Sequence, residues 1–123
     1  MRYHILLIGI GGAIGSIFRY LLQLFIRNYW AVVFPIGTFI VNIMGCLFIG
    51  ILYGLTIKNI GISEEWRLFL IVGFCGGFTT FSSYSYESIV LLRNGQFLYF
   101  FLYVTLSVAI GLFATFLGMF ITR

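Results

Sequence analysis

A short polar stretch at residues 73–87 interrupts an otherwise hydrophobic region and carries residue types that could form an ion site. It contains two adjacent glycines and two adjacent threonines, followed by further hydroxyl groups, aromatic rings and a carboxylate. Glycine loosens a helical backbone, and threonine hydroxyls compete for its hydrogen bonds. In a membrane, unwound backbone is tolerated only where protein buries it or where it lines a polar cavity. The stretch therefore predicts a helix that is broken near Gly76 to Thr80, with free carbonyl groups that could hold a cation.

The residues after the expected break also fit an ion site. Phe81 and Tyr84 are three positions apart, so they share one face of the helix that resumes there. Ser82, Ser85 and Glu87 lie beside that face. These rings, hydroxyls and the carboxylate extend the predicted ion site beyond the break.

The composition places these residues in a membrane protein. The chain has 123 residues, of which 62% are hydrophobic, 20% aromatic and only 8% charged. A soluble domain of this size cannot bury so much apolar surface. We expect one all-α domain of four transmembrane helices, at about residues 4–26, 36–57, 66–92 and 97–121. The net charge of +4 is spread over the helix ends, which suits contact with lipid headgroups and gives no nucleic-acid patch.

The first expected span carries a packing motif and one arginine. Gly11 and Gly15 are four positions apart, so they form a small-residue face on which another helix can pack closely. Arg19 lies about two turns from the end of the span, from which its side chain can reach the membrane interface. Alternatively, protein groups hold it inside the membrane, and such an arginine is usually paired or functional. The sequence leaves both interpretations open.

The second and fourth spans contribute further polar side chains. Thr38 and Asn42 are one turn apart, and a lone asparagine in a membrane helix is costly unless it is hydrogen-bonded. Asn42 either joins two helices or lines a pore, and its expected place beside the broken helix favours the pore. In the fourth span, Tyr103 and Ser107 belong to a ladder of small and hydroxyl residues spaced by four. That ladder fits a packing seam or an anion's path.

The loop before the third span contains a helix start signal. Ser63 can cap the helix that follows it, and Glu64 and Glu65 then fall in the first turn, where negative charge is favoured. This position accounts for both acids without a catalytic role.

The basic residues give only a weak preference for one orientation in the membrane. With four spans, one side collects Arg2, Lys58, Arg67 and Arg123, and the other side collects Arg27, Arg93 and, if it reaches the interface, Arg19. Since this difference is small, the positive-inside rule predicts that the chain can insert both ways and pair with an inverted copy.

Three motifs resemble those of a known family. They are Gly12-x-x-Gly15-x-x-x-Arg19-Tyr20, Gly37-Thr-x-x-Val-Asn42-x-x-Gly45 and Gly73-Phe-Cys-Gly-Gly-x-Thr-Thr-Phe-Ser82. Together they look like the Fluc (CrcB) fluoride channels of microbes, and the resemblance covers all four spans. It implies a multi-pass channel of the plasma membrane that exports fluoride passively from the cytoplasm and relieves fluoride toxicity. It also implies an antiparallel, dual-topology homodimer with two pores.

The resemblance further implies roles for individual residues. A structural sodium ion at the dimer centre, which is not transported, would be bound by the backbone carbonyls of Gly76 and Thr79 in each subunit. Arg19 would attract anions in a vestibule. The fluoride pore would be lined by Thr38, Asn42, Phe81, Ser82, Tyr84, Ser85, Glu87, Tyr103 and Ser107. Two positions depart from the family pattern, because Tyr84 stands where a second phenylalanine is frequent and Gly111 stands where relatives usually have a hydroxyl.

Three other functions fit the sequence less well than a channel does. A structural or assembly subunit of a membrane complex would use the same glycines for packing and the same polar residues as bonds between helices. A small dual-topology multidrug transporter would need a carboxylate in the first span, and that span has none. An enzyme is not expected, because the sequence has no cluster of His, Cys and Asp, no Ser–His pair and one intramembrane acid, Glu87.

Overall fold

The protein consists entirely of helices in the residues that the computed structural model describes, which are 2–30, 32–57 and 62–122. Lys58 and Arg123, which entered the charge comparison above, lie outside these described residues. The elements are α1 (Arg2–Tyr29), α2 (Ile36–Ile57), α3 (Glu64–Arg67), η1 (Leu68–Cys75), α4 (Gly76–Phe78), α5 (Phe81–Arg93) and α6 (Phe97–Ile121). Ser63 caps α3 by accepting a hydrogen bond from the Trp66 backbone N–H at 3.3 Å, which confirms the predicted start signal.

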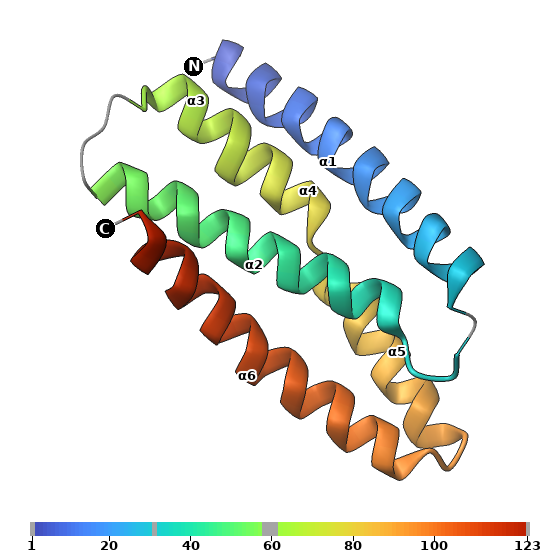
Figure 1. The fold of residues 1–123 in the computed structure, drawn as a ribbon. Coiled ribbons are helices and arrows are strands. Elements are labelled where there is room, and N and C mark those ends of the chain that lie inside the picture. Colours follow the sequence, from blue (N-terminus) through green and yellow to red (C-terminus); the bar gives the residue numbers. More distant parts are fainter. Residues whose placement is uncertain (1, 31, 58–61, 123) are drawn as a thin grey trace.

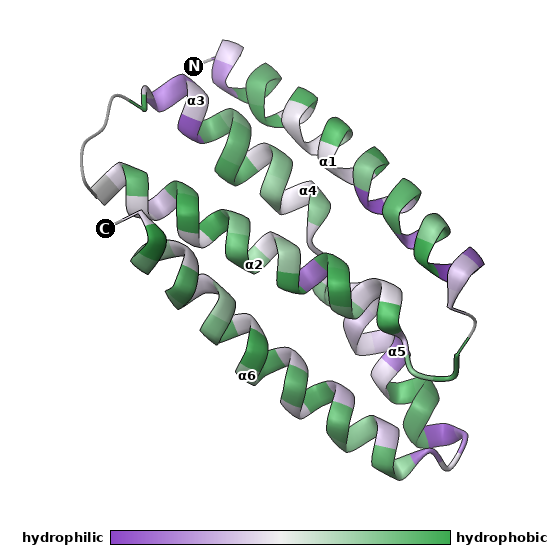
Figure 2. Ribbon diagram, viewed as in Figure 1, coloured by the Kyte–Doolittle hydropathy of each residue, from purple (hydrophilic) through white to green (hydrophobic). Residues whose placement is uncertain are grey.

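Among the described residues, four helical segments are long and apolar enough to cross a membrane, namely Arg2–Tyr29, Ile36–Thr56, Glu64–Arg93 and Phe97–Ile121. Apolar residues cover most of their length, and hydrophilic residues gather near helix ends and around α5 (Figure 2). The protein is therefore a multi-pass membrane protein with the four predicted spans. The described ends of the chain lie at the same end of the bundle, as an even number of spans requires (Figure 1).

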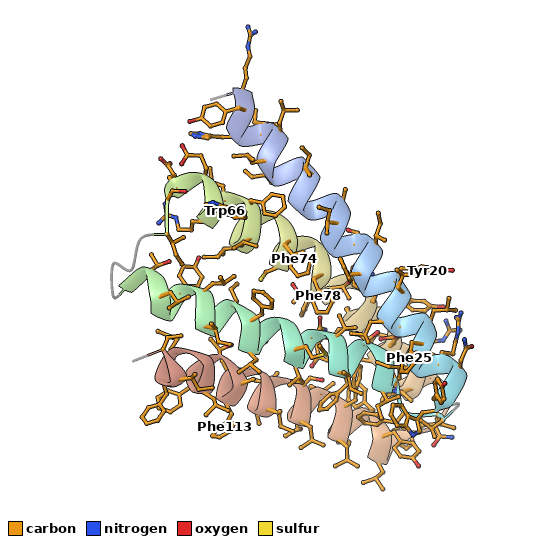
Figure 3. All side chains as sticks on the ribbon, turned by 45° about the horizontal axis from the view of Figure 1, so that its top comes forward. Tyr20, Phe25, Trp66, Phe74, Phe78 and Phe113 are labelled. Carbon is orange, nitrogen blue, oxygen red and sulfur yellow. The ribbon has the colours of Figure 1, made fainter. Side chains whose placement is uncertain are left out.

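The third span changes its neighbours along its length. Its first part, η1 and α4, packs along α1, whereas α5 packs against α6 (Figure 1). The other large helix contact joins α2 and α6. Phe74 and Phe78 lie between α1 and α2, while Phe113 on α6 points away from the other helices (Figure 3). The change of neighbours takes place where α4 ends and α5 begins.

Glycines allow α1 and the third span to approach closely. Gly11 and Gly15 are both buried on α1, as the predicted small-residue face requires. A Cβ atom at Gly15 would overlap the backbone carbonyl of Phe74, and one at Gly77 would overlap the carbonyl of Gly12. The backbones thus lie in direct contact, which only residues without a side chain permit.

The π-helical part of the third span was not predicted. Residues Leu68–Cys75 form a π-helix, in which each backbone N–H bonds five residues back. All eight residues are apolar or glycine. Because no polar residue recurs at a helical spacing in this segment, the sequence could not distinguish a π-helix from an ordinary α-helix.

Candidate ion-binding site

The third span is interrupted by two threonines. Thr79 and Thr80 have extended backbone, with φ/ψ of −88°/157° and −149°/118°, and α5 begins at the next residue. The sequence placed a break near Gly76 to Thr80, but Gly76 and Gly77 continue the helix as α4. The threonine side chains account for the actual position. Thr79 donates its hydroxyl to the Cys75 carbonyl at 2.8 Å, and Thr80 caps α5 by accepting from the Ser83 N–H at 3.2 Å.

Asn42 on α2 supplies the hydrogen bonds that the interrupted backbone lacks. Its Nδ2 donates to the Thr80 carbonyl at 3.0 Å, and its Oδ1 accepts from the Thr80 N–H at 2.9 Å. A carboxamide carries one acceptor and a two-hydrogen donor, so it can pair with both groups of one residue. Asn42 thus joins α2 to the third span, which was one of the two interpretations left open. One amide hydrogen remains beyond this pair, and the pore role stays a prediction.

Arg19 is held by protein at the end of α4. Its Nε donates to the Gly77 carbonyl at 3.1 Å, and Ser16 on the same helix lies 3.5 Å from that oxygen. A cation is favoured at a helix C-terminus, where backbone carbonyls lack partners. Of the two interpretations of Arg19, the structure therefore shows the one in which protein groups bind it.

The carbonyl oxygens of Gly77 and Thr80 accept hydrogen bonds from the side chains described above, whereas those of Gly76 and Thr79 do not. In the described part of the chain, no hydrogen bond is found to either oxygen. Gly76 is exposed, and no atom lies within 4 Å of the place that its Cβ would take. Both oxygens are thus able to accept an external partner.

A cavity of about 350 Å³ brings several predicted pore residues together. Asn42, Phe81, Tyr84 and Ser107 line it, and so do the two threonines of the break. Ser107 is notable because, within the described residues, its Oγ is buried and has no hydrogen-bond partner. Phe81 lies at the rim, with 76% of its surface exposed, and its ring centroid is 5.7 Å from that of Tyr84. Hydroxyl, amide and aromatic side chains therefore line one space, and groups of these types can contact an anion.

Glu87, Thr38 and Tyr103 form a separate hydrogen-bonded cluster. Thr38 donates to Glu87 Oε2 at 3.0 Å, and Tyr103 donates to Oε1 at 3.1 Å. Thr38 is 2% exposed and Tyr103 is fully buried. Tyr84 connects the cluster to the cavity, since its ring lies 5.1 Å from the Tyr103 ring.

One member of this cluster was not found from the sequence. Gln23 on α1 donates its Nε2 to the Thr38 hydroxyl at 2.9 Å and so extends the chain of hydrogen bonds. A signal was present, because Arg19, Gln23 and Arg27 are spaced by four and share one face of α1. Polar side chains are rare inside or near a membrane span, so this spacing could have drawn attention to Gln23.

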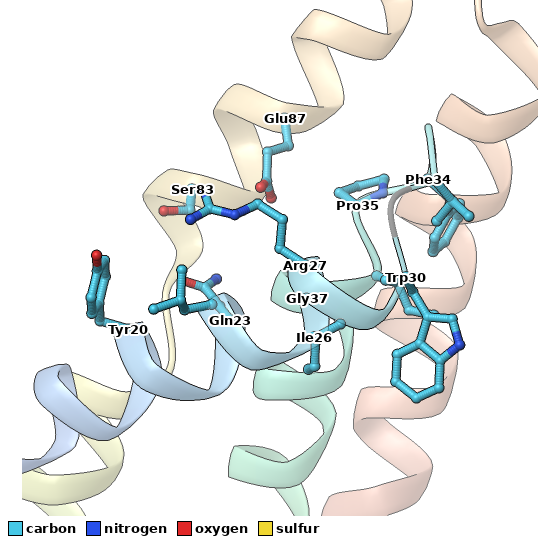
Figure 4. Close-up of a pocket in the computed structure, with 13 residues that line it drawn as sticks. Tyr20, Gln23, Ile26, Arg27, Trp30, Phe34, Pro35, Gly37, Ser83 and Glu87 are labelled. Carbon is cyan, nitrogen blue, oxygen red and sulfur yellow. The ribbon is translucent and has the colours of Figure 1, made fainter.

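A second pocket, of about 400 Å³, opens beside Glu87. Gln23 and Arg27 of α1 line it together with Ser83 and Glu87 of α5, and Pro35 and Gly37 border it at the start of α2 (Figure 4). This pocket contains none of the residues that line the first cavity.

Ser82 and Ser85 are not brought into either space. Both are exposed on α5, and Ser82 Oγ lies 3.3 Å from the Thr80 hydroxyl. Their predicted contact with an ion stays a prediction that another surface would have to complete.

Known proteins resemble this chain over almost its whole length. Residues 6–119 match the family described as "CrcB-like protein, Camphor Resistance (CrcB)". The chain is 47% identical over 116 residues to the "Fluoride-specific ion channel FluC" of Flavobacterium psychrophilum, which covers 94% of each chain. It is 45% identical over 123 residues to the protein of the same name from Azobacteroides pseudotrichonymphae, which covers 100% of this chain and 98% of the relative. With that from Aquifex aeolicus it shares 42% identity over 111 residues, 90% of each chain.

Proposed function

The chain belongs to the CrcB family, and from this premise we propose that it is a fluoride-selective channel. In this proposal it exports fluoride passively across the plasma membrane and so relieves fluoride toxicity. Its relatives carry the name of a fluoride-specific channel, and the match extends over all four spans. The observation that carries the proposal is the cavity in which Ser107 presents a buried hydroxyl without a partner, opposite Asn42 and Phe81.

The chemistry of this cavity suits fluoride. The ion is small and strongly hydrated, so a pore must replace its lost water with closely spaced donors. Hydroxyl and amide groups are such donors, and the positive edge of an aromatic ring contacts an anion without a full charge. Weak contacts at several sites also allow the ion to leave, which conduction requires.

A structural sodium ion is part of the proposal. The carbonyl oxygens of Gly76 and Thr79 fit such an ion, since they are oxygen ligands without a described hydrogen-bond partner and Gly76 is exposed. When bound, the cation would supply positive charge near the pore and lower the barrier for an anion. Efflux should fall when sodium is replaced by a larger cation such as N-methylglucamine, and full activity without sodium would contradict this site.

The proposed assembly is an antiparallel, dual-topology homodimer with two pores. A single chain leaves large apolar side chains exposed beside the polar cavity, and Phe81 at 76% is the clearest case. A second copy placed over this face would close the cavity and bring exposed Ser82 and Ser85 toward protein.

The decisive experiment is fluoride efflux from liposomes. The purified protein is reconstituted, and fluoride and chloride release are followed with ion-selective electrodes. Rapid loss of fluoride with chloride retained is the expected result. If well-folded dimers released no fluoride, the channel would be refuted and an assembly subunit would become the leading alternative.

A further inference from the structure

We propose that the pocket beside Glu87 is a second mouth of the ion pathway, and that Arg27 is the residue that attracts anions into it. The inference rests on the proposed channel function and extends it to residues that lie outside the cavity of Asn42 and Ser107. It starts from the pocket of about 400 Å³ between the last turns of α1, the start of α2 and the middle of α5.

The polar groups in this pocket are arranged around a single cation. Arg27, in the last turn of α1, extends its guanidinium group across the pocket toward Ser83 and Glu87 (Figure 4). Both oxygens of Glu87 are already occupied, because they accept hydroxyl hydrogen bonds from Thr38 and Tyr103 at 3.0 and 3.1 Å. The carboxylate is thus turned toward its hydroxyl partners, and Arg27 is placed to offset its charge at the pocket surface. By offsetting the charge of the carboxylate, Arg27 lowers the repulsion that an anion entering this pocket would otherwise meet.

The pocket is also close to the central cavity. Tyr103 binds Glu87 on one side and lies against Tyr84 on the other, with 5.1 Å between the ring centroids. Tyr84 lines the cavity that contains Asn42 and Ser107. The rings of Tyr84 and Tyr103 therefore connect the cavity to Glu87, and in this proposal the ion path passes along them.

Gln23 stabilises this arrangement from α1. Its hydrogen bond to Thr38, at 2.9 Å, fixes the hydroxyl that in turn binds Glu87. Gln23 and Arg27 are one turn apart, so the same helix face positions the carboxylate and supplies the cation. Gln23 is a positioning residue in this account, and Arg27 is the residue that meets the ion.

The chain contains a matched control for Arg27. Arg93 lies in the last turn of α5, at the same end of the bundle, but it does not line the pocket. Arg27 and Arg93 carry the same charge, and each lies in the last turn of its helix. If Arg27 served only as an anchor for lipid headgroups, then neutralising either residue would have similar effects.

The test compares fluoride efflux from liposomes for the wild type, Arg27→Gln, Arg27→Lys and Arg93→Gln at low and high ionic strength. We expect Arg27→Gln to slow efflux by roughly three- to tenfold in low salt, because local attraction of anions is lost. The effect should shrink in high salt, since the Debye length falls from about 30 Å at 0.01 M to about 10 Å at 0.1 M. Arg93→Gln should stay close to the wild type, and Arg27→Lys, which keeps the charge, should recover most of the efflux that Arg27→Gln loses.

A second experiment changes the charge at position 27 after the protein has folded. Arg27→Cys and Arg93→Cys are treated with a cationic or an anionic methanethiosulfonate reagent, and treated wild type gives the baseline for the native cysteines. The cationic reagent should restore efflux in Arg27→Cys and the anionic one should lower it further, with no such difference at Arg93→Cys.

The outcomes separate the two proposals. A wild type without fluoride efflux would overturn the channel and this inference together. An active wild type, with Arg27→Gln equal to Arg93→Gln at every salt concentration and no effect of reagent charge at Arg27→Cys, would overturn the second mouth alone.

Discussion

At the scale of single residues, Ser107 and Asn42 border the same cavity but their polar atoms are used differently. Ser107 has a buried hydroxyl without a protein partner in the described residues. Asn42 uses its amide oxygen and one amide hydrogen to bind the backbone of Thr80. A buried polar group without a partner is costly, so the Ser107 hydroxyl is able to bind a partner from outside the chain. The two residues therefore predict different results when they are truncated.

Replacing Ser107 should affect ion flux and leave stability unchanged. Ser107→Ala removes a donor from the cavity but breaks no protein hydrogen bond, so the apparent melting temperature in detergent should stay within error. Fluoride efflux should fall severalfold. Ser88→Ala is the matched control, because that hydroxyl donates to the Tyr84 carbonyl at 2.7 Å and does not line the cavity. Equal efflux in both variants would remove Ser107 from the pore.

Replacing Asn42 should reduce both the ion flux and the stability of the protein. Asn42→Ala leaves the N–H and C=O groups of Thr80 without partners, and each unsatisfied buried group costs about 1–3 kcal/mol. We expect a lower melting temperature and slower efflux, with a dimer still present on size-exclusion chromatography. Unaltered efflux would remove Asn42 from the pore, and an unaltered melting temperature would show that its bonds to Thr80 are dispensable.

At the scale of elements, the third span has two different tasks on either side of its break. Before Thr79, Gly73 and Gly77 lie in direct backbone contact with α1. After Thr80, the span presents Tyr84 to α6 and Glu87 to α2. A continuous helix could not change neighbours so abruptly, because its faces turn at a fixed rate. The break therefore allows one span both to pack tightly and to line a cavity.

The close contact between α1 and the third span gives a prediction about glycine. Gly15→Ala places a Cβ atom on the Phe74 carbonyl and should destabilise the protein by about 1–3 kcal/mol through overpacking. Gly9→Ala on the same helix meets no atom within 4 Å and should be neutral or slightly stabilising. Thermal unfolding of both variants in detergent checks this pair, and equal melting temperatures would show that α1 can shift at little cost.

At the scale of the whole molecule, the distribution of charge and the exposed surfaces both influence how two copies of the chain assemble. By the order of the spans, four basic residues belong to one side of the membrane and, because protein groups hold Arg19, two belong to the other side. The central cavity is open at Phe81, whose side chain is largely exposed in a single chain. A protein that inserts in both orientations can cover this opening with an inverted copy of itself.

The proposed dual topology predicts two populations in a cell. Reporters that are active on opposite sides of the membrane, fused in turn to the C-terminus, should both give a signal because the charge bias is small. Adding two lysines to one end of the bundle should fix a single orientation and reduce fluoride export. If the unmodified chain gave a signal from one reporter only, dual topology would be refuted for this protein.

The properties that the sequence predicted are those that depend on local composition. The four spans follow from the length and apolarity of each segment, and the Ser63 cap follows from a hydroxyl placed just before a helix. The interruption near the two threonines and the small-residue face of Gly11 and Gly15 are likewise short-range patterns. Each needs only neighbouring residues and the energetics of backbone in a membrane.

The tertiary structure decided which polar groups meet. Asn42 and Thr80 are 38 positions apart, and Thr38 and Glu87 are 49 apart, so no local pattern could pair them. The sequence also could not show that Tyr103 and Glu87 form a hydrogen-bonded cluster with Thr38 and Gln23 beside a second pocket, and their predicted place on the ion route stays a prediction. Helix rotation and crossing fix these contacts, because a turn of the helix decides whether a side chain faces lipid, a neighbouring helix or a cavity.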